Sequence, residues 1–143
     1  MFRNVRLGMW ATCVLLTMQV GVANAGPADV VLYASDAVNL HGNWARVPDA
    51  TAAGGQMMSS ADRGGAWTGS PQAAPADYFD FTFVAPADTN YHIWIRLRAA
   101  ANSKYNDSLF AQFSDSRDST GAAVFGLGST SGLTVNLATD GSG

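Results

Sequence analysis

Apolar and polar residues alternate with a period of two in the middle of the chain, at residues 78–84 and again at residues 91–98. Because successive side chains of a β-strand point to opposite faces, this spacing predicts two strands with one buried face each. The segment Ala85-Pro86-Ala87-Asp88 between them has turn composition and predicts a hairpin connection. The apolar residues that we expect in the core are Phe79, Phe81, Phe83, Ile93, Ile95 and Leu97.

Shorter strand-like segments occur at residues 30–35, 108–113, 122–125 and 133–137, and polar, glycine-rich stretches separate them. No segment after residue 25 sustains the 3.6-residue period of a helix. Glutamate is absent and lysine is rare, and both are residues that helices favour. Strands joined by such loops predict an all-β fold, an antiparallel β-sandwich.

The first 25 residues have the three-part layout of a secretory signal peptide. Two basic residues, Arg3 and Arg6, precede a mostly apolar stretch, which ends in the small-x-small sequence Ala23-Asn24-Ala25. The apolar stretch is shorter than the roughly 20 residues that a membrane-spanning helix needs. We therefore expect residues 1–25 to be a cleaved signal peptide and residues 26–143 to form the exported domain.

The amino-acid composition indicates the cellular location of the protein and excludes some classes of partner. The one cysteine, Cys13, lies in the expected signal peptide, so the domain after it has no disulfide, and this indicates a secreted or periplasmic bacterial protein. The 143-residue chain has a formal net charge of −3, its eleven acidic residues are all aspartate, and it has no basic cluster. We therefore expect no nucleic acid as a partner, and no membrane after signal cleavage.

Several aromatic residues stand in polar loop segments where sugars could be bound. Flat aromatic rings stack on the apolar face of a pyranose ring, and amides and carboxylates bond to its hydroxyls. The ligand-binding residues that we expect are Trp67, Tyr105, Asn106 and Trp44. For Trp67 the alternative is a ring that caps the end of the sandwich. For Trp44 the alternative is packing, which its strand-like neighbours favour. A second candidate platform is the strand face that carries His92, Trp94 and Arg96.

Three segments carry a family resemblance: Asp49 to Gly55, Pro75 to Phe83, and Tyr91 to Arg98. They resemble the Ala-Ser-Gly-Gly turn, the Gly-Asp-Tyr strand and the following hairpin of carbohydrate-binding modules of families 6 and 35. The resemblance extends over residues 30–137. It implies a galactose-binding-like jelly-roll sandwich that binds a polysaccharide or oligosaccharide without catalysis.

The chain departs from these modules at two places. They commonly open with a Glu-Ala-Glu strand whose carboxylates help to bind a structural calcium ion, and Tyr33-Ala34-Ser35 stands there in this chain. They close with an Asp-x-Ile-x-Ile-Asp strand, and this chain has none. The cofactor therefore stays unknown, since the acidic positions that calcium needs are not matched. We also expect the sandwich to lack its last strands.

Enzyme motifs are missing from the sequence. His41 and His92 lack the spacing of metal ligands, and there is no Gly-x-Ser-x-Gly sequence. Asp77 and Asp80 are the best pair for glycoside hydrolysis, but Asp77 fits a turn. We expect no catalysis. The alternatives to a carbohydrate-binding module are a structural or adhesion β-sandwich whose aromatic residues form the core, and a fragment of a larger secreted polysaccharide-active enzyme.

Cleavage of the expected signal peptide can be tested on exported protein. We expect protein recovered from the periplasm or the medium of a bacterial host to begin at Gly26, because the cleavage motif ends at Ala25. N-terminal sequencing of the exported protein measures this directly. Exported protein that still begins at Met1 would contradict the prediction.

Overall fold

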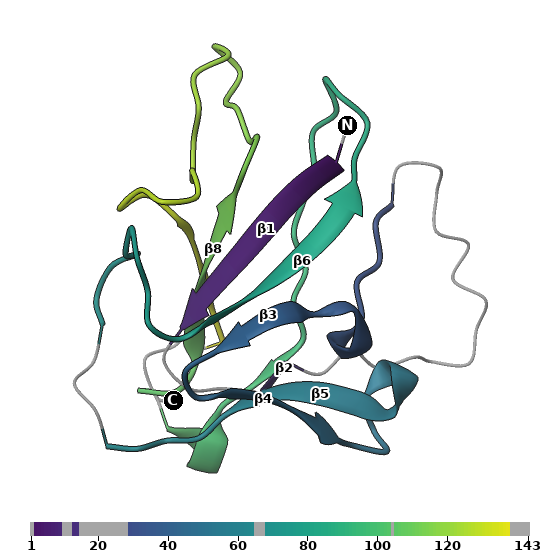
Figure 1. The fold of residues 1–143 in the computed structure, drawn as a ribbon, viewed down its shortest axis with the longest axis vertical. Coiled ribbons are helices and arrows are strands. Elements are labelled where there is room, and N and C mark those ends of the chain that lie inside the picture. The colour runs from purple at the N-terminus through teal and green to yellow at the C-terminus, as the bar shows by residue number, and fades with distance from the viewer. Residues whose placement is uncertain (1, 10–12, 15–28, 65–67, 104, 138–143) are drawn as a thin grey trace.

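The computed structural model describes residues 2–9, 13–14, 29–64, 68–103 and 105–137 of the chain. In this part of the chain the fold is all-β, and Figure 1 shows strands and loops with short 3₁₀ turns. The strands are β1 (Phe2–Met9), β2 (Cys13–Val14), β3 (Val38–His41), β4 (Trp44–Pro48), β5 (Gln56–Ser60), β6 (Tyr78–Val84), β7 (Leu97–Arg98), β8 (Ser108–Phe113) and β9 (Leu133–Asn136). The 3₁₀ turns are η1 (Ala34–Asp36), η2 (Ala53–Gly55) and η3 (Ala100–Asn102). None of the helical turns described is long and apolar enough to cross a bilayer.

The strands form two sheets in which every neighbouring pair is antiparallel. One sheet has the order β3-β6-β1-β8-β9, and the other has the order β4-β5-β2-β7. The N-terminal segment therefore enters both sheets. β1 runs between β6 and β8, as Figure 1 shows, and β2 pairs with β5 on one side and β7 on the other.

One apolar cluster draws residues from both sheets. Phe79 of β6 is 1% exposed, and its ring packs edge-on against Trp44 of β4 with the centroids 4.8 Å apart. Such an aromatic pair contributes about 0.5–1.5 kcal/mol beyond the area that it buries. The buried residues of the cluster are Ala34, Ala37, Trp44, Met58, Phe79, Phe81, Leu109 and Ala111. The contact between β4 and β6 thus links the two sheets at the centre of this cluster.

The expected all-β class is confirmed, and so are three of the expected strands. β6, β8 and β9 match the segments that alternation predicts, to within one residue at the end of β9. Phe79 and Phe81 are buried as expected, and Phe83, Ile95 and Leu97 are partly buried against the same cluster. Where a partner strand is present on each side, the apolar period of two is a sound guide to the buried face.

The prediction for residues 91–98 is wrong except at the end of the segment. Only Leu97–Arg98 forms a strand, β7, and it lies in the other sheet from β6, so the connection between them is not a hairpin. Ile93 is exposed and is not part of the core. The neighbour of β7 is β2, whose described residues Cys13 and Val14 pair with Arg98 and Leu97. Alternation shows which face a strand can bury, but it does not show whether a neighbouring strand is present to form hydrogen bonds with it.

The predictions of strands at residues 30–35 and 122–125 are also wrong. The first segment runs into η1, where a carboxylate oxygen of Asp36 accepts the N–H of Tyr33 at 2.8 Å. In the second, Ala123 makes an isolated bridge with Arg117. Aspartate and serine side chains that bond to nearby main-chain groups compete with sheet formation in such short segments.

The turn between β3 and β4 packs against the residues at the beginning of β6. Gly42 in this turn has a φ of +66°, a conformation that glycine adopts without strain. A Cβ atom on it would clash with the carboxylate of Asp77 and lie 2.7 Å from the main-chain oxygen of Ala76. The same carboxylate accepts the N–H of Asn43 at 2.6 Å. Both the backbone angle and the crowding therefore require glycine here.

Part of the expected signal peptide is folded into the two sheets. β1 and β2 both lie within residues 1–25, whereas the cleavage motif at residues 23–25 lies outside the described residues. Removal of residues 1–25 stays a prediction. If it occurs, it removes a strand from each sheet.

We expect Phe79→Ala to lower the free energy of unfolding by about 3–5 kcal/mol, because a fully buried ring is replaced by a cavity. Val84→Thr is the control, since Val84 is an exposed residue of the same strand, and its effect should stay within about 0.5 kcal/mol. Denaturant unfolding of the three proteins measures both values. Equal losses in the two variants would contradict the assignment of the buried face.

Candidate functional site

Two loops that are distant in the sequence meet through one hydrogen bond. Nδ2 of Asn106 donates to Oδ2 of Asp62 over 2.9 Å. Asp62 follows β5 and Asn106 precedes β8, and these strands belong to different sheets. The bond therefore joins the ends of the two sheets and sets the position of the loop that carries Tyr105.

Tyr105 presents its side chain next to this junction, and it is 64% exposed. The loop around it has its own main-chain support. The N–H of Tyr105 points to Oγ of Ser103 at 3.3 Å, and the N–H of Asn106 donates to the carbonyl oxygen of Ser103 at 2.9 Å. An exposed aromatic residue on a supported loop can offer a flat surface in a defined orientation, as stacking on a ligand requires.

Asn106 itself is buried, with 5% of its surface exposed. The sequence suggested that its amide would bond to a sugar hydroxyl. In the structure the amide nitrogen donates to Asp62 instead. Asn106 thus acts here as a positioning residue, and its partner Asp62 is an exposed residue.

Asp62 is the exposed polar residue that sequence reasoning missed. Its Oδ1 accepts the N–H of Gly64 at 2.8 Å, while Oδ2 accepts the amide of Asn106. The bond from Asn106, and after it the bond from Gly64, hold the pKa of Asp62 below the ordinary value for aspartate. The available signal was the sequence Asp62-Arg63-Gly64, since an aspartate in a turn often accepts the N–H two residues onward. Ionised carboxylate oxygens accept hydrogen bonds from hydroxyl groups, so Asp62 could bond to a sugar.

The other two predicted residues do not join Tyr105 in the described structure. Trp67 lies outside the described residues, three positions after Gly64 in the chain. Trp44 is 5% exposed and packs against Phe79 in the core. A ring in that place cannot stack on a ligand unless the core opens, so the structure favours the packing alternative for Trp44. Its Nε1 has no hydrogen-bond partner among the described residues.

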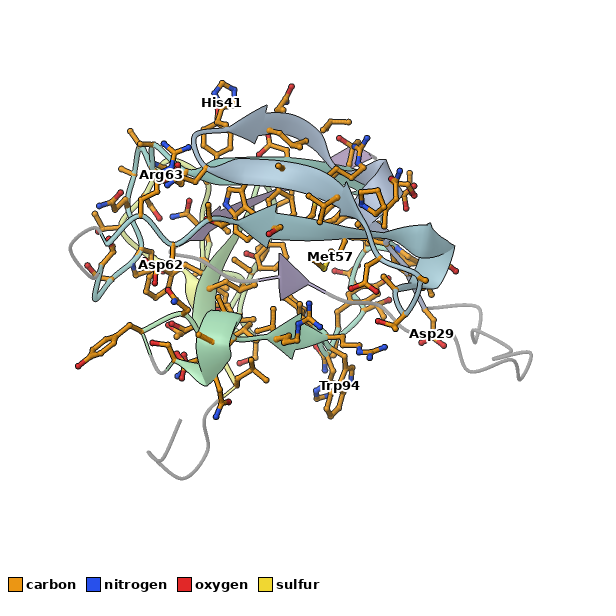
Figure 2. The ribbon with its side chains drawn as sticks, turned by 90° about the horizontal axis from the view of Figure 1, so that it is seen from below. Asp29, His41, Met57, Asp62, Arg63 and Trp94 are labelled. Carbon is orange, nitrogen blue, oxygen red and sulfur yellow. The ribbon has the colours of Figure 1, made fainter. Side chains whose placement is uncertain are left out.

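A second aromatic surface lies on the segment before β7. Trp94 is 89% exposed, and Figure 2 shows its side chain pointing away from the ribbon. Tyr91 and Ile93 beside it are also exposed. His92 and Arg96, which the sequence placed with Trp94 on one strand face, are exposed too, although the segment does not form a strand. The surface is accessible, but among the described residues no side-chain hydrogen bond anchors it as Asn106 anchors the Tyr105 loop.

The acidic pair considered for hydrolysis has structural partners. Asp77 accepts the N–H of Asn43, and Asp80 accepts Nδ2 of Asn39 at 3.0 Å. His41 stacks on Tyr78 with the ring centroids 4.5 Å apart. These contacts hold β3 and the β3–β4 turn on β6. Within the described residues, no three His, Cys, Asp or Glu side chains gather in a way that could hold a metal ion.

Comparison of the chain with protein-family models, with curated proteins and with solved structures gave no match. The candidate site therefore rests on its own geometry: the exposed ring of Tyr105, the exposed carboxylate of Asp62, and the buried amide of Asn106 that joins their loops.

We expect Asn106→Ala to raise the pKa of Asp62 toward its ordinary value, because the largest cause of the lowered pKa is lost. Titration of the aspartate carboxyl carbons by NMR measures the shift. Asp118 is the internal control, since its pKa is lowered by Thr120 and should not move. An unchanged Asp62 would show that Asn106 does not bond to it in solution.

The sign of the pH effect follows from the same bonds. A carboxyl whose pKa is lower in the folded state stabilises the fold above its unfolded-state pKa, and that contribution disappears as the pH falls through the folded-state pKa. The difference in stability between wild type and Asn106→Ala should therefore become smaller in acid, below the ordinary pKa of aspartate.

Proposed function

We propose that the chain forms an exported, non-catalytic carbohydrate-binding module with a jelly-roll β-sandwich, and that it binds a polysaccharide or oligosaccharide through loop aromatic residues. The observation that carries the proposal is the exposed ring of Tyr105 beside the Asp62–Asn106 bond. The combination offers an apolar stacking surface and a hydroxyl acceptor on one supported pair of loops.

The sandwich part of the proposal is supported by the shared core. The two antiparallel sheets contribute Trp44, Met58, Phe79 and Leu109 to a single buried cluster, as two sheets packed face to face would. Loops at the ends of such sheets are held by the strands while their own sequences vary, which suits them to ligand binding. Trp67 is part of the proposal as a further stacking residue, because it follows Asp62 on the same loop of the sequence.

The expected affinity is low. Sugar hydroxyls exchange hydrogen bonds with water for hydrogen bonds with protein, so each such contact contributes only about 0.5–1.5 kcal/mol. Stacking on one or two rings adds a similar amount. Together a few contacts of this kind correspond to dissociation constants from about micromolar to millimolar.

A structural or adhesion domain is the competing function, and Trp44 favours it, since one predicted binding residue has proved to be a core residue. In that case Tyr105 would be an exposed residue without a ligand. Glycan titration separates the two proposals, because an adhesion or structural domain without a sugar site would bind none of the glycans.

We expect calorimetric titration with β-glucans, xylans, galactans and polymers of uronic acids to find one class that binds. Tyr105→Ala should weaken that binding at least about tenfold, which corresponds to about 1.4 kcal/mol of lost stacking. Tyr105→Phe keeps the ring and should retain most of the affinity. Trp67→Ala should weaken binding in the same direction.

Trp94→Ala is the matched control, since it also removes an exposed aromatic ring but leaves the Tyr105 loop intact. If Trp94→Ala abolishes binding and Tyr105→Ala does not, the surface around Trp94 is the site. If the wild-type protein binds none of the four glycan classes, the structural alternative takes precedence.

A further inference from the structure

The first strand of the chain, β1, is the central strand of the five-stranded sheet. β1 pairs with β6 over seven residue pairs, from Phe2 opposite Val84 to Gly8 opposite Tyr78. On its other side it pairs with β8 over five, from Val5 opposite Phe113 to Met9 opposite Leu109. Both pairings are antiparallel. β6 and β8 therefore run in the same direction, and each bonds to the strand between them.

If β1 were absent, β6 and β8 could not pair directly with each other. Adjacent strands lie about 4.8 Å apart, so two strands separated by a third are about 9.6 Å apart, too far for a main-chain hydrogen bond. Without β1, both strands would expose a row of N–H and C=O groups along the edges that now face it. Such edges pair readily with an added strand.

The strand β1 lies in the segment that we expect signal peptidase to remove. Residues 2–9 carry Arg3 and Arg6 and lie in the segment with the layout of a cleavable signal peptide. β2 lies in the same segment and joins β5 to β7 in the other sheet. A single cleavage after Ala25 would thus separate the central strand of the five-stranded sheet from the rest of the chain.

We propose that the position of β1 between β6 and β8 is a strand-acceptor site, which binds an extended peptide in trans when the N-terminal segment is no longer part of the chain. The N-terminal segment occupies the site in the uncleaved chain. The partner is an extended stretch of about seven residues that runs antiparallel to both neighbours and is held by main-chain hydrogen bonds.

The register also indicates the charge of the partner. Arg6 of β1 stands directly opposite Asp80 of β6. Asp80 is largely buried, and one of its carboxylate oxygens accepts Nδ2 of Asn39. Like charges at directly paired positions oppose pairing. The site should therefore disfavour a strand with an acidic residue opposite Asp80.

The experiment uses the whole chain. A recognition sequence for a specific protease replaces residues 22–27, and the protein is made by cell-free synthesis without membranes, so that no signal peptidase acts on it. After cutting, a fluorescent peptide with the sequence of residues 2–14 is added, and its uptake is followed by anisotropy. Hydrogen exchange of the β6 and β8 amides is measured before cutting, after cutting with removal of the free N-terminal peptide, and after peptide addition.

We expect the labelled peptide to bind to the cut protein and to restore the protection of β6 and β8 by about tenfold or more. The matched peptide carries Val5→Pro and Gly8→Pro, which remove main-chain N–H groups toward both neighbours because the positions differ by an odd number. This peptide should not bind. A peptide with Arg6→Glu should bind more weakly than the parent peptide.

The proposal is overturned if the parent peptide does not bind to the cut protein, or if the proline peptide binds equally well, since adhesion without main-chain pairing would explain that result. It is also overturned if β6 and β8 keep full protection after the N-terminal peptide has been removed from a monomer. If the cut protein dimerises and added peptide disperses the dimer, a second copy is the partner that fills the site. A dimer that the peptide leaves intact contradicts the proposal.

Discussion

The fold depends on main-chain pairing at the centres of its two sheets. β1 connects β6 to β8, and β2 connects β5 to β7. Without β1 the five-stranded sheet would be left as the pairs β3–β6 and β8–β9, and isolated two-stranded units are only marginally stable in water. The apolar cluster between the sheets would then have to hold the pieces together alone. The loop that carries Tyr105 leads into β8, which pairs with β1 on one side and β9 on the other.

The candidate site follows from that arrangement. The loop after β5 and the loop before β8 extend from different sheets, and the Asp62–Asn106 bond joins them. The buried amide serves as the anchor, and the exposed residues Tyr105 and Asp62 lie beside it, where we propose that a sugar binds. Polar groups that are buried and paired give a loop a defined shape at little cost, because their bonds are satisfied in the folded state.

The sequence predicted well where local pattern and tertiary context agree, and failed where they differ. The phenylalanines of β6 alternate and lie between two partner strands, so the strand and its buried face were both predictable. Residues 91–98 alternate equally well, yet among the described residues only Leu97 and Arg98 of this segment pair with a neighbouring strand. Local alternation does not show whether a neighbouring strand is there to pair with.

The site was predictable to a similar extent. The exposure of Tyr105 agrees with its polar loop sequence, and the burial of Trp44 agrees with its strand-like neighbours. Asp62 and Asn106 are 44 positions apart, and only the fold shows that they bond.

The turn at Gly42 has a consequence for the ancestry of the chain. Asp77 fills the space that a side chain on Gly42 would need, and its carboxylate bonds to the next residue of the turn. A larger residue at position 42 would clash with Asp77 and with the main-chain oxygen of Ala76, and loss of the aspartate would leave the N–H of Asn43 without this acceptor. Gly42 and Asp77 should therefore be retained together. Such a linked pair offers a way to recognise distant homologues whose overall identity is too low for an alignment to detect.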